Sequence, residues 1–445
     1  MKIICFILIL FLSNILLFGQ NTTKWLYDLQ SPEIAFESTY FMGSPTVDNT
    51  FIESYFDGAY LSDYLKKTTF NNLTPTNILG TYNNFKLSYT MPVLAGGSTV
   101  AYYFAAENKT IADLQFDESL FKMFFAGNAQ FAGDTLYIKD NFMSLTNFTQ
   151  LKGGLVKQFN TARFQHTFFG ALSLNVGTIN NNILIDNARF YTDAEGSLID
   201  TDIDMVYQWV KNKSDSKLKV VNGLGTSLDF CYNFKCDKGN SLSIAFNDIG
   251  FVKWFKPYSN VIDKDTAFTF EGIEIKDILN IEASTDNLNK DSINTKITEL
   301  TDNRSYTSLL PMTMRLYFHH EINKSIEIGA GMKHVFNTAH KPFYFVDAKF
   351  YIQPLFMISP TLSYGGYAGF NAGLDLGFSI RQYSCIFGSD YITPFYDNKN
   401  FRGKGYYFRI VKRISTGPKS FEGSDNVRIS RKPRCPKYRG SIFNN

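Results

Sequence analysis

Short stretches in which apolar and polar residues alternate recur along most of this 445-residue chain. The pattern is clearest over residues 369–381, where one face is apolar and the other carries Asn371, Asp375, Ser379 and Arg381. A period of two without a helical repeat predicts β-strands whose two faces have unlike surroundings. In water the apolar face would need a second sheet to cover it, whereas in lipid it needs no cover.

The same pattern predicts fourteen strands. They cover residues 33–43, 83–92, 97–107, 148–160, 164–190, 222–235, 240–256, 309–321, 324–336, 342–353, 355–365, 369–381, 383–392 and 404–414. Tight and long links alternate along this series, and the longest are 44–82, 108–147, 191–221 and 257–308. Short turns at one end and long loops at the other are expected of outer-membrane barrels, whereas a soluble sandwich has no reason to sort loops by length.

The sequence therefore predicts an all-β fold: a transmembrane antiparallel up-and-down β-barrel of about fourteen strands, with short loop helices. The fifth strand is unusually long, and its distal part around residues 183–191 is expected to project beyond the bilayer. Residues 116–126 predict a loop helix with an Asp N-cap and a stop at Gly127. Its apolar side predicts packing either in the lumen, as part of a plug, or on the barrel rim, and we favour the lumen.

Three parts of the chain differ in composition. Residues 1–19 have the positive start, apolar run and small cleavage residue of a signal peptide, and the run is too short for a membrane anchor. Residues 20–414 are then the barrel, with residues 20–32 tucked towards or into its periplasmic end as a plug. Residues 415–445 are basic and contain prolines, which predicts a disordered periplasmic tail, either solvated or in contact with a partner or an anionic cell-wall polymer.

Several classes of function find no support in the composition. A net charge of +3 without a basic stripe gives no indication of nucleic-acid binding. His319 and His320 are adjacent, so on a strand they face opposite sides and cannot share a metal ion. No nucleophile elbow or phosphate loop is present, and the glycine-rich segment 365–369 predicts a tight hairpin. We therefore expect no enzyme, no catalytic residue, no metal site and no cofactor.

The polar faces of the later strands supply candidates for the lumen. They carry charges of both signs, on Asp229, Arg315, Lys333, Asp347, Lys349 and Asp375. Mixed signs favour a salt-bridge lattice that stiffens a narrow barrel over a selective path for ions.

One strand contains a polar interruption, formed by Asn247, Asp248, Ile249 and Gly250. Small polar residues inside a strand predict a bulge that kinks the wall. The simplest interpretation is that the kink shapes the wall without binding anything. Trp254 follows, and we expect it where the strand meets the membrane interface.

Several segments together resemble a family of Bacteroidota outer-membrane barrels of unknown function. They are Leu114–Asn128, Asn222–Phe230, Leu242–Trp254, Phe270–Ile275 and Leu309–Pro311. That family is distantly similar to the long-chain fatty-acid transporter barrels and to barrels that accompany type IX secretion. The resemblance implies fold and location in the outer membrane of a Gram-negative bacterium, and it brings no established activity. The similarity to the transporters implies a lateral opening at the kink, through which a hydrophobic ligand leaves the lumen.

We therefore expect an outer-membrane barrel, in contact with outer-membrane lipid, that passes a small hydrophobic molecule through a plugged lumen. The alternative is a non-transporting scaffold that binds a type IX secretion or surface-assembly partner through its outer loops and basic tail. A surface adhesin is a third interpretation. A continuous apolar pocket from an outer loop to residues 247–250 would favour passage, and a lumen filled with side chains would favour the scaffold.

Overall fold

A computed structural model describes residues 29, 31–95, 98–194, 198–210, 221–236, 239–271, 300–352, 355–398 and 401–414. The predicted leader and basic tail lie outside these residues, as does most of the predicted plug segment, so those three assignments stay predictions.

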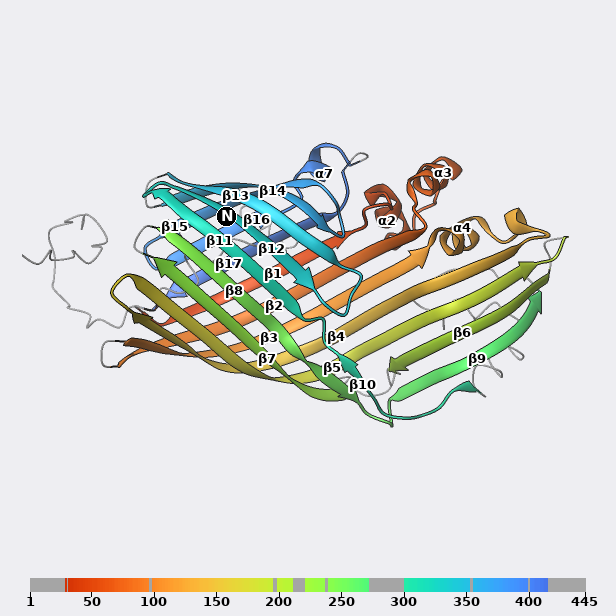
Figure 1. Ribbon diagram of the computed structural model, residues 1–445, viewed down its shortest axis with the longest axis horizontal. Helices are drawn as coiled ribbons and strands as arrows, with labels where there is room; N and C mark the ends of the chain where they lie inside the picture. The colour runs from red at the N-terminus through yellow and green to blue at the C-terminus, as the bar shows by residue number, and fades with distance from the viewer. Residues whose placement is uncertain are drawn as a thin grey trace, which may run out of the picture.

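The predicted fold class is confirmed. Within the described residues, fourteen strands form a closed antiparallel ring (Figure 1). In order around the ring they are β1 (Glu33–Gly43), β2 (Thr76–Ala95), β3 (Ser98–Asp117), β4 (Thr135–Asn160), β5 (Phe164–Thr192), β7 (Gly223–Cys236), β8 (Asn240–Trp254), β11 (Thr313–Asn323), β12 (Ile326–Val335), β13 (Lys341–Ile352), β14 (Phe356–Gly366), β15 (Asn371–Ile380), β16 (Tyr383–Ser389) and β17 (Lys404–Arg413). The last strand pairs with the first, from Met42 opposite Lys404 to Glu33 opposite Arg413, so the ring has no open edge.

The two ends of the barrel differ as predicted. At one end, here the turn end, only a few residues separate consecutive strands; Asn160 ends β4, for example, and Phe164 begins β5. At the other, here the loop end, the connections contain most of the remaining elements: helices α2 (Asn49–Phe56), α3 (Asp63–Asn72), α4 (Glu118–Ala126) and α7 (Thr393–Tyr396), the short 3₁₀ helix η1 (Ala129–Phe131), and strands β6 (Leu198–Val210), β9 (Ser259–Glu271) and β10 (Tyr306–Leu309).

The barrel is polar inside and apolar outside, the reverse of a water-soluble core. On β5, for example, the outward Leu172 is 69% exposed, whereas the inward Asn175 is fully buried. Gln150 and Lys349 are likewise almost completely buried. An exterior of leucine, isoleucine and phenylalanine side chains is stable only where acyl chains or another apolar phase solvate it.

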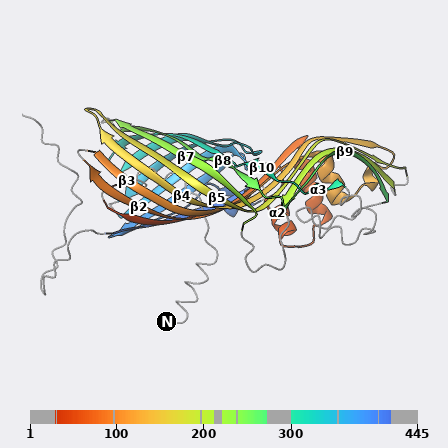
Figure 2. The ribbon, with the colours of Figure 1, turned by 90° about the horizontal axis from the view of Figure 1, so that it is seen from below.

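Strands β2, β3 and β4 are longer than the sequence predicts, and together with β5 they continue past the ring at its loop end. There β6 pairs with the distal part of β5, and β9 pairs with β6, so a curved sheet extends beyond the barrel (Figures 1 and 2). Residues 183–191 of β5 therefore project beyond the ring, and their position relative to the bilayer stays a prediction. The extra length of β3 escaped prediction because its outward residues change from Tyr102 and Phe104 to Asn108 and Thr110, which ends the apolar face.

The loop helix forms where predicted: the Asp117 side chain accepts a hydrogen bond from the Ser119 N–H, and the helix ends before Gly127. The preference for the lumen was wrong. The Phe121 ring packs against Phe116 and Phe51, in a cluster with α2 and α3 that covers the outward face of β2 and β3 beyond the ring. Figure 2 shows α2 and α3 against the sheet extension. Among the residues described, no helix is long and apolar enough to cross a membrane.

Candidate functional site

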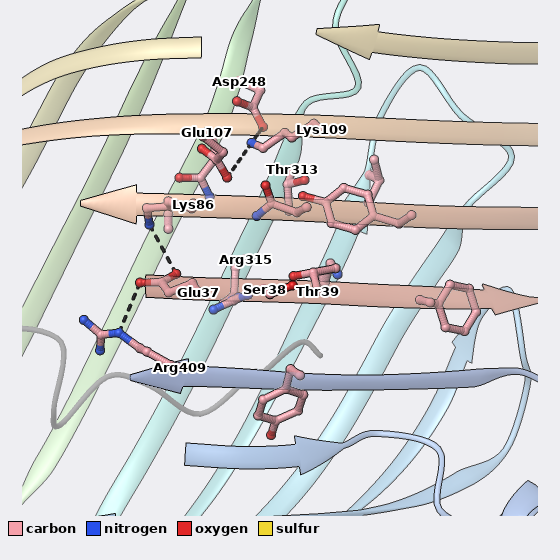
Figure 3. Close-up of a pocket in the computed structure, with 18 of the residues that line it drawn as sticks. Glu37, Ser38, Thr39, Lys86, Glu107, Lys109, Asp248, Thr313, Arg315 and Arg409 are labelled. Atoms are coloured by element: carbon pink, nitrogen blue, oxygen red, sulfur yellow. Dashed lines mark hydrogen bonds and ion pairs between the residues drawn. The ribbon is translucent and has the colours of Figure 1, made fainter. Parts of the chain in front are cut away.

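The lumen contains a cavity of about 280 Å³. Its walls come from both halves of the ring, and Figure 3 shows polar side chains from several of these strands directed into it. The lining combines charged side chains with the aromatic rings of Tyr82, Tyr103, Phe169, Phe343 and Tyr391. The cavity is therefore amphiphilic.

A row of buried and half-buried ion pairs crosses the cavity wall from β17 to β8 and is called the charged belt below. It begins at Arg409, whose guanidinium lies 3.1 Å from the Glu37 carboxylate, and Glu37 also pairs with Lys86 at 3.3 Å (Figure 3). Lys86 on β2 lies directly opposite Glu107 on β3 in the strand register. The belt then continues from Glu107 into a more tightly packed group.

That group surrounds Lys152. Its ammonium lies 2.6 Å from Asp229, 2.9 Å from Glu107 and 3.5 Å from Asp248. Lys109 bridges Asp248 at 2.6 Å and Glu107 at 3.3 Å (Figure 3). All five side chains are at most 6% exposed. Because buried charges are stable only when paired and hydrogen-bonded, this group makes a rigid wall.

The predicted kink is a bulge at Asp248, where φ is +64°. This left-handed backbone is uncommon outside glycine, and aspartate is among the residues that tolerate it. The Asp248 N–H donates to Asp229 Oδ1 at 2.8 Å, and the side chain turns into the lumen to meet both lysines and the Gln150 amide. The belt therefore holds the bulge in place.

The bulge adjoins an interruption in the wall. Strand β8 pairs with β7 along one edge. Along its other edge it pairs with β11 up to Asn247, which lies opposite Thr313, and with β10 from Phe251, which lies opposite Leu309. Residues 248–250 and 310–312 lie between these two ladders and are called the seam below. Within the seam, the Leu310 N–H donates to the Gly250 carbonyl at 3.0 Å. Asn247, Asp248 and Thr313 line the cavity, so the cavity reaches the seam.

Trp254 does not lie at a membrane interface. It is completely buried, and its indole N–H donates to Ser308 Oγ at 2.8 Å. The reason is the bulge: Asn247 and Asp248 both face inward, so the alternation changes phase and carries Val252 and Trp254 to the inner side.

The six predicted lumen residues fall into two groups. Asp229, Arg315 and Lys333 line the cavity, and Arg315 and Lys333 are directly opposite each other on β11 and β12. Asp347, Lys349 and Asp375 are buried and make contacts with tyrosine hydroxyls instead. Tyr317 Oη lies 3.2 Å from both Asp347 and Lys349, and the Tyr407 hydroxyl donates to Asp375.

Sequence reasoning missed most of the charged belt: Glu33, Glu37, Lys86, Glu107, Lys109, Lys152 and Arg409. The signal was present, since Lys152 follows the outward Leu151 in the same alternation that identified Asp229. Among the described residues, no group of His, Cys, Asp or Glu is arranged to hold a metal ion.

Apolar clusters lie at both ends of the cavity. At the turn end Leu29 packs with Ala101 and Val156. At the loop end a cluster that includes Phe41, Phe343, Tyr367 and Tyr391 lies over it.

Two titratable groups at this loop-end cover lie beyond the part of the barrel with an apolar exterior. Burial and the nearby Lys333 lower the pKa of His340 to about 3, so its imidazole is neutral. Burial raises the pKa of Asp113 to about 6, although hydrogen bonds from Tyr367 and Ala339 partly oppose that shift.

A closed antiparallel ring with charges inside and hydrocarbon side chains outside defines the class: a β-barrel of the outer-membrane type. Residues 35–390 match the family described as "Family of unknown function (DUF5723)". The chain belongs to this family.

Solved structures of barrels resemble this one at low sequence identity. The Pseudomonas putida toluene transporter TodX is 7% identical, covers 89% of this chain and 93% of its own, and has a TM-score of 0.36. A Pseudomonas aeruginosa FadL homologue is 8% identical, covers 87% and 91%, and has a TM-score of 0.40. A Rhodopseudomonas blastica porin is 8% identical over 86% and 99%, with a TM-score of 0.26. No curated protein matches the sequence.

Proposed function

We propose that this protein is an outer-membrane barrel that takes a small amphiphilic molecule into its lumen and releases it to the bilayer through the seam. The observation that carries the proposal is the cavity itself, whose lining combines charged and aromatic side chains and reaches the seam at Asn247 and Asp248.

The lining narrows the class of molecule from hydrophobic to amphiphilic. A pure hydrocarbon beside Lys86, Glu107 and Asp248 would displace water from charged groups without replacing its hydrogen bonds, which is costly. A molecule with a polar head and an apolar body can contact both the charged and the aromatic side chains of the lining. The cavity volume of about 280 Å³ limits the size of the apolar body of such a molecule.

The seam supports a lateral route. Between its two ladders the pairing of β8 is interrupted, and Pro311 on the other side has no N–H to donate. Leu310 is 1% exposed and belongs to an apolar cluster with Val252 and Trp254 at the seam. Movement of one apolar side chain there disturbs fewer hydrogen bonds than separation of two fully paired strands would.

Binding can be tested with octanoate, octyltrimethylammonium, octanol and glucose as probes for the purified mature protein in a mild detergent. Native mass spectrometry should show saturable binding of at least one of the three amphiphiles and none of glucose. Ala245 lines the cavity, whereas Ile244 next to it faces outward, so Ala245→Phe should abolish binding and Ile244→Phe should not. The proposal would be refuted if both variants bound the amphiphile equally, or if none of the three amphiphiles showed saturable binding.

The route can be tested with a photoreactive analogue of the amphiphile that binds, in proteoliposomes. Cross-links should fall on peptides that contain residues 247–250 and 310–313. Cross-links confined to the turn end would refute lateral release while leaving binding intact.

A further inference from the structure

Two connections at the loop end fold inward over the cavity. They are the β12–β13 loop, residues 336–340, and the β14–β15 turn, residues 367–370, and together they are here called the lid. Thr338, His340 and Tyr367 of the lid line the cavity.

One side chain on the opposite wall accepts two hydrogen bonds from the lid. Asp113 on β3 accepts a hydrogen bond from the Ala339 N–H at 2.6 Å and another from the Tyr367 hydroxyl at 2.7 Å. In the order of the ring, β3 lies across the lumen from the strands that carry the lid. These two bonds therefore connect the lid to the far side of the barrel mouth. Asp113 and its two hydrogen bonds are called the latch below.

The surroundings of the Tyr367 ring fit this closed position. The ring stacks on Phe41 at 6.0 Å between centroids and meets the His340 ring edge-on at 5.1 Å. It also lies over Gly80 of β2, where a Cβ atom would come within 2.4 Å of the ring. Any larger residue at position 80 would push the lid away from β2.

The latch differs chemically from the charged belt. Asp113 is 2% exposed, and its two hydrogen-bond donors are both neutral. Besides the Tyr367 phenol, the lid carries the His340 imidazole, whose ring meets Tyr367 edge-on. Lys109 on the same face of β3 is engaged by Glu107 and Asp248. A buried carboxylate with neutral partners is held less firmly than one paired with ammonium groups.

We propose that the lid is a gate, latched shut by Asp113, whose release opens the cavity to the loop end. The gate does not depend on which molecule the cavity takes. It predicts that loss of the latch makes the cavity accessible without unfolding the barrel.

Cys231 is a natural reporter for this gate, because its thiol lines the cavity on β7. In a variant with Cys236, Cys385 and Cys435 changed to serine, the rate at which a membrane-impermeant methanethiosulfonate modifies Cys231 in intact cells measures access. Asp113→Ala removes both bonds of the latch and should raise this rate most. Tyr367→Phe removes one bond and keeps the ring, and it should raise the rate roughly tenfold, the effect of one hydrogen bond to a carboxylate.

Asn141→Ala is the matched control. Asn141 is 3% exposed and accepts a hydrogen bond from the Asp117 N–H at the loop end, outside the lid. Its loss should leave the Cys231 rate unchanged, and heat-modifiable gel mobility should show that all three variants are folded. A rate equal to wild type in folded Asp113→Ala and Tyr367→Phe would overturn the gate, because entry from the turn end labels all of them alike. Ligand binding plays no part in this readout, so its failure and the failure of the proposed function are distinguishable.

Discussion

Replacement of Lys152 by methionine tests whether the charged belt holds the barrel together. Methionine keeps the length and apolar stem of lysine and removes its charge. Three carboxylates, on Glu107, Asp229 and Asp248, then face each other with Lys109 as their remaining close cation. The charged belt then lacks the cation that pairs with all three carboxylates, while the outward-facing surface of the barrel is unchanged.

The structure sets the size of the effect. At an effective dielectric constant of 20, each pair at about 3–4 Å contributes about 4 kcal/mol or more of attraction, most of which offsets the desolvation of the ions. Breaking a buried pair typically costs roughly 3–5 kcal/mol, because the partner charges remain buried. We expect the free energy of unfolding of Lys152→Met to fall by that amount. Protonation of the stranded carboxylates limits the loss.

The measurement is equilibrium unfolding by guanidinium in detergent micelles, followed by tryptophan fluorescence and heat-modifiable gel mobility. Arg304→Ala is the control, since the Arg304–Asp263 pair has the same charge type but both side chains are more than half exposed. Its loss should cost less than about 1 kcal/mol. Adding Asp229→Asn to Lys152→Met should restore part of the lost stability, because Asn keeps the acceptor for the Asp248 N–H. A cost for Lys152→Met no larger than that of the control would refute the reasoning.

Two further predictions concern the bulge and the latch. Gly250→Ala should destabilise the barrel by roughly 1–3 kcal/mol, because a Cβ atom there would lie 2.1 Å from the Thr226 carbonyl; the same unfolding assay checks it. Closing the lid raises the pKa of Asp113 from its ordinary range to about 6, so the closed lid takes up a proton. Acid therefore favours closure, and this advantage is lost as the pH rises through about 6. The labelling rate of Cys231, taken relative to Asp113→Asn at each pH to cancel the thiol's own titration, should fall between pH 7 and pH 5. A constant ratio would contradict this linkage.

The alternation of residues was sufficient to predict the ring, because the period of a strand is a local property. It located all fourteen strands, the long fifth strand and the order of short and long connections. It failed where the outward side chains become polar, as at Asn108 and Thr110, because a strand that is not surrounded by an apolar phase needs no apolar face. Strands β6 and β9 pair in that region and escaped prediction for the same reason.

A single extra residue limited the prediction of the site. The sequence showed that Asn247–Gly250 interrupts a strand, but it could not show that Asp248 would point inward next to Asn247. That geometry depends on Asp229, Lys109 and Lys152, which come from three other strands. The phase of every later residue in β8 follows from it, and Trp254 was therefore placed on the wrong side. Likewise, the charge of Lys152 could be predicted to face the lumen, but not its three partners, because pairing across strands depends on register.

Two buried aspartates illustrate how surroundings, rather than residue type, assign a role in this lumen. Asp248 has ammonium groups at 2.6 and 3.5 Å, so its charge is compensated and its strained backbone is held by several contacts at once. Asp113 has only neutral donors among its hydrogen-bond partners, an amide and a phenol, and both belong to the lid. Displacing Asp248 would remove one of the three carboxylates that neutralise the buried Lys109 and Lys152. Displacing the lid instead returns Asp113 to water, where its charge is stable. The same type of side chain therefore forms part of a fixed wall at the bulge, as Asp248, and a releasable contact at the mouth of the barrel, as Asp113.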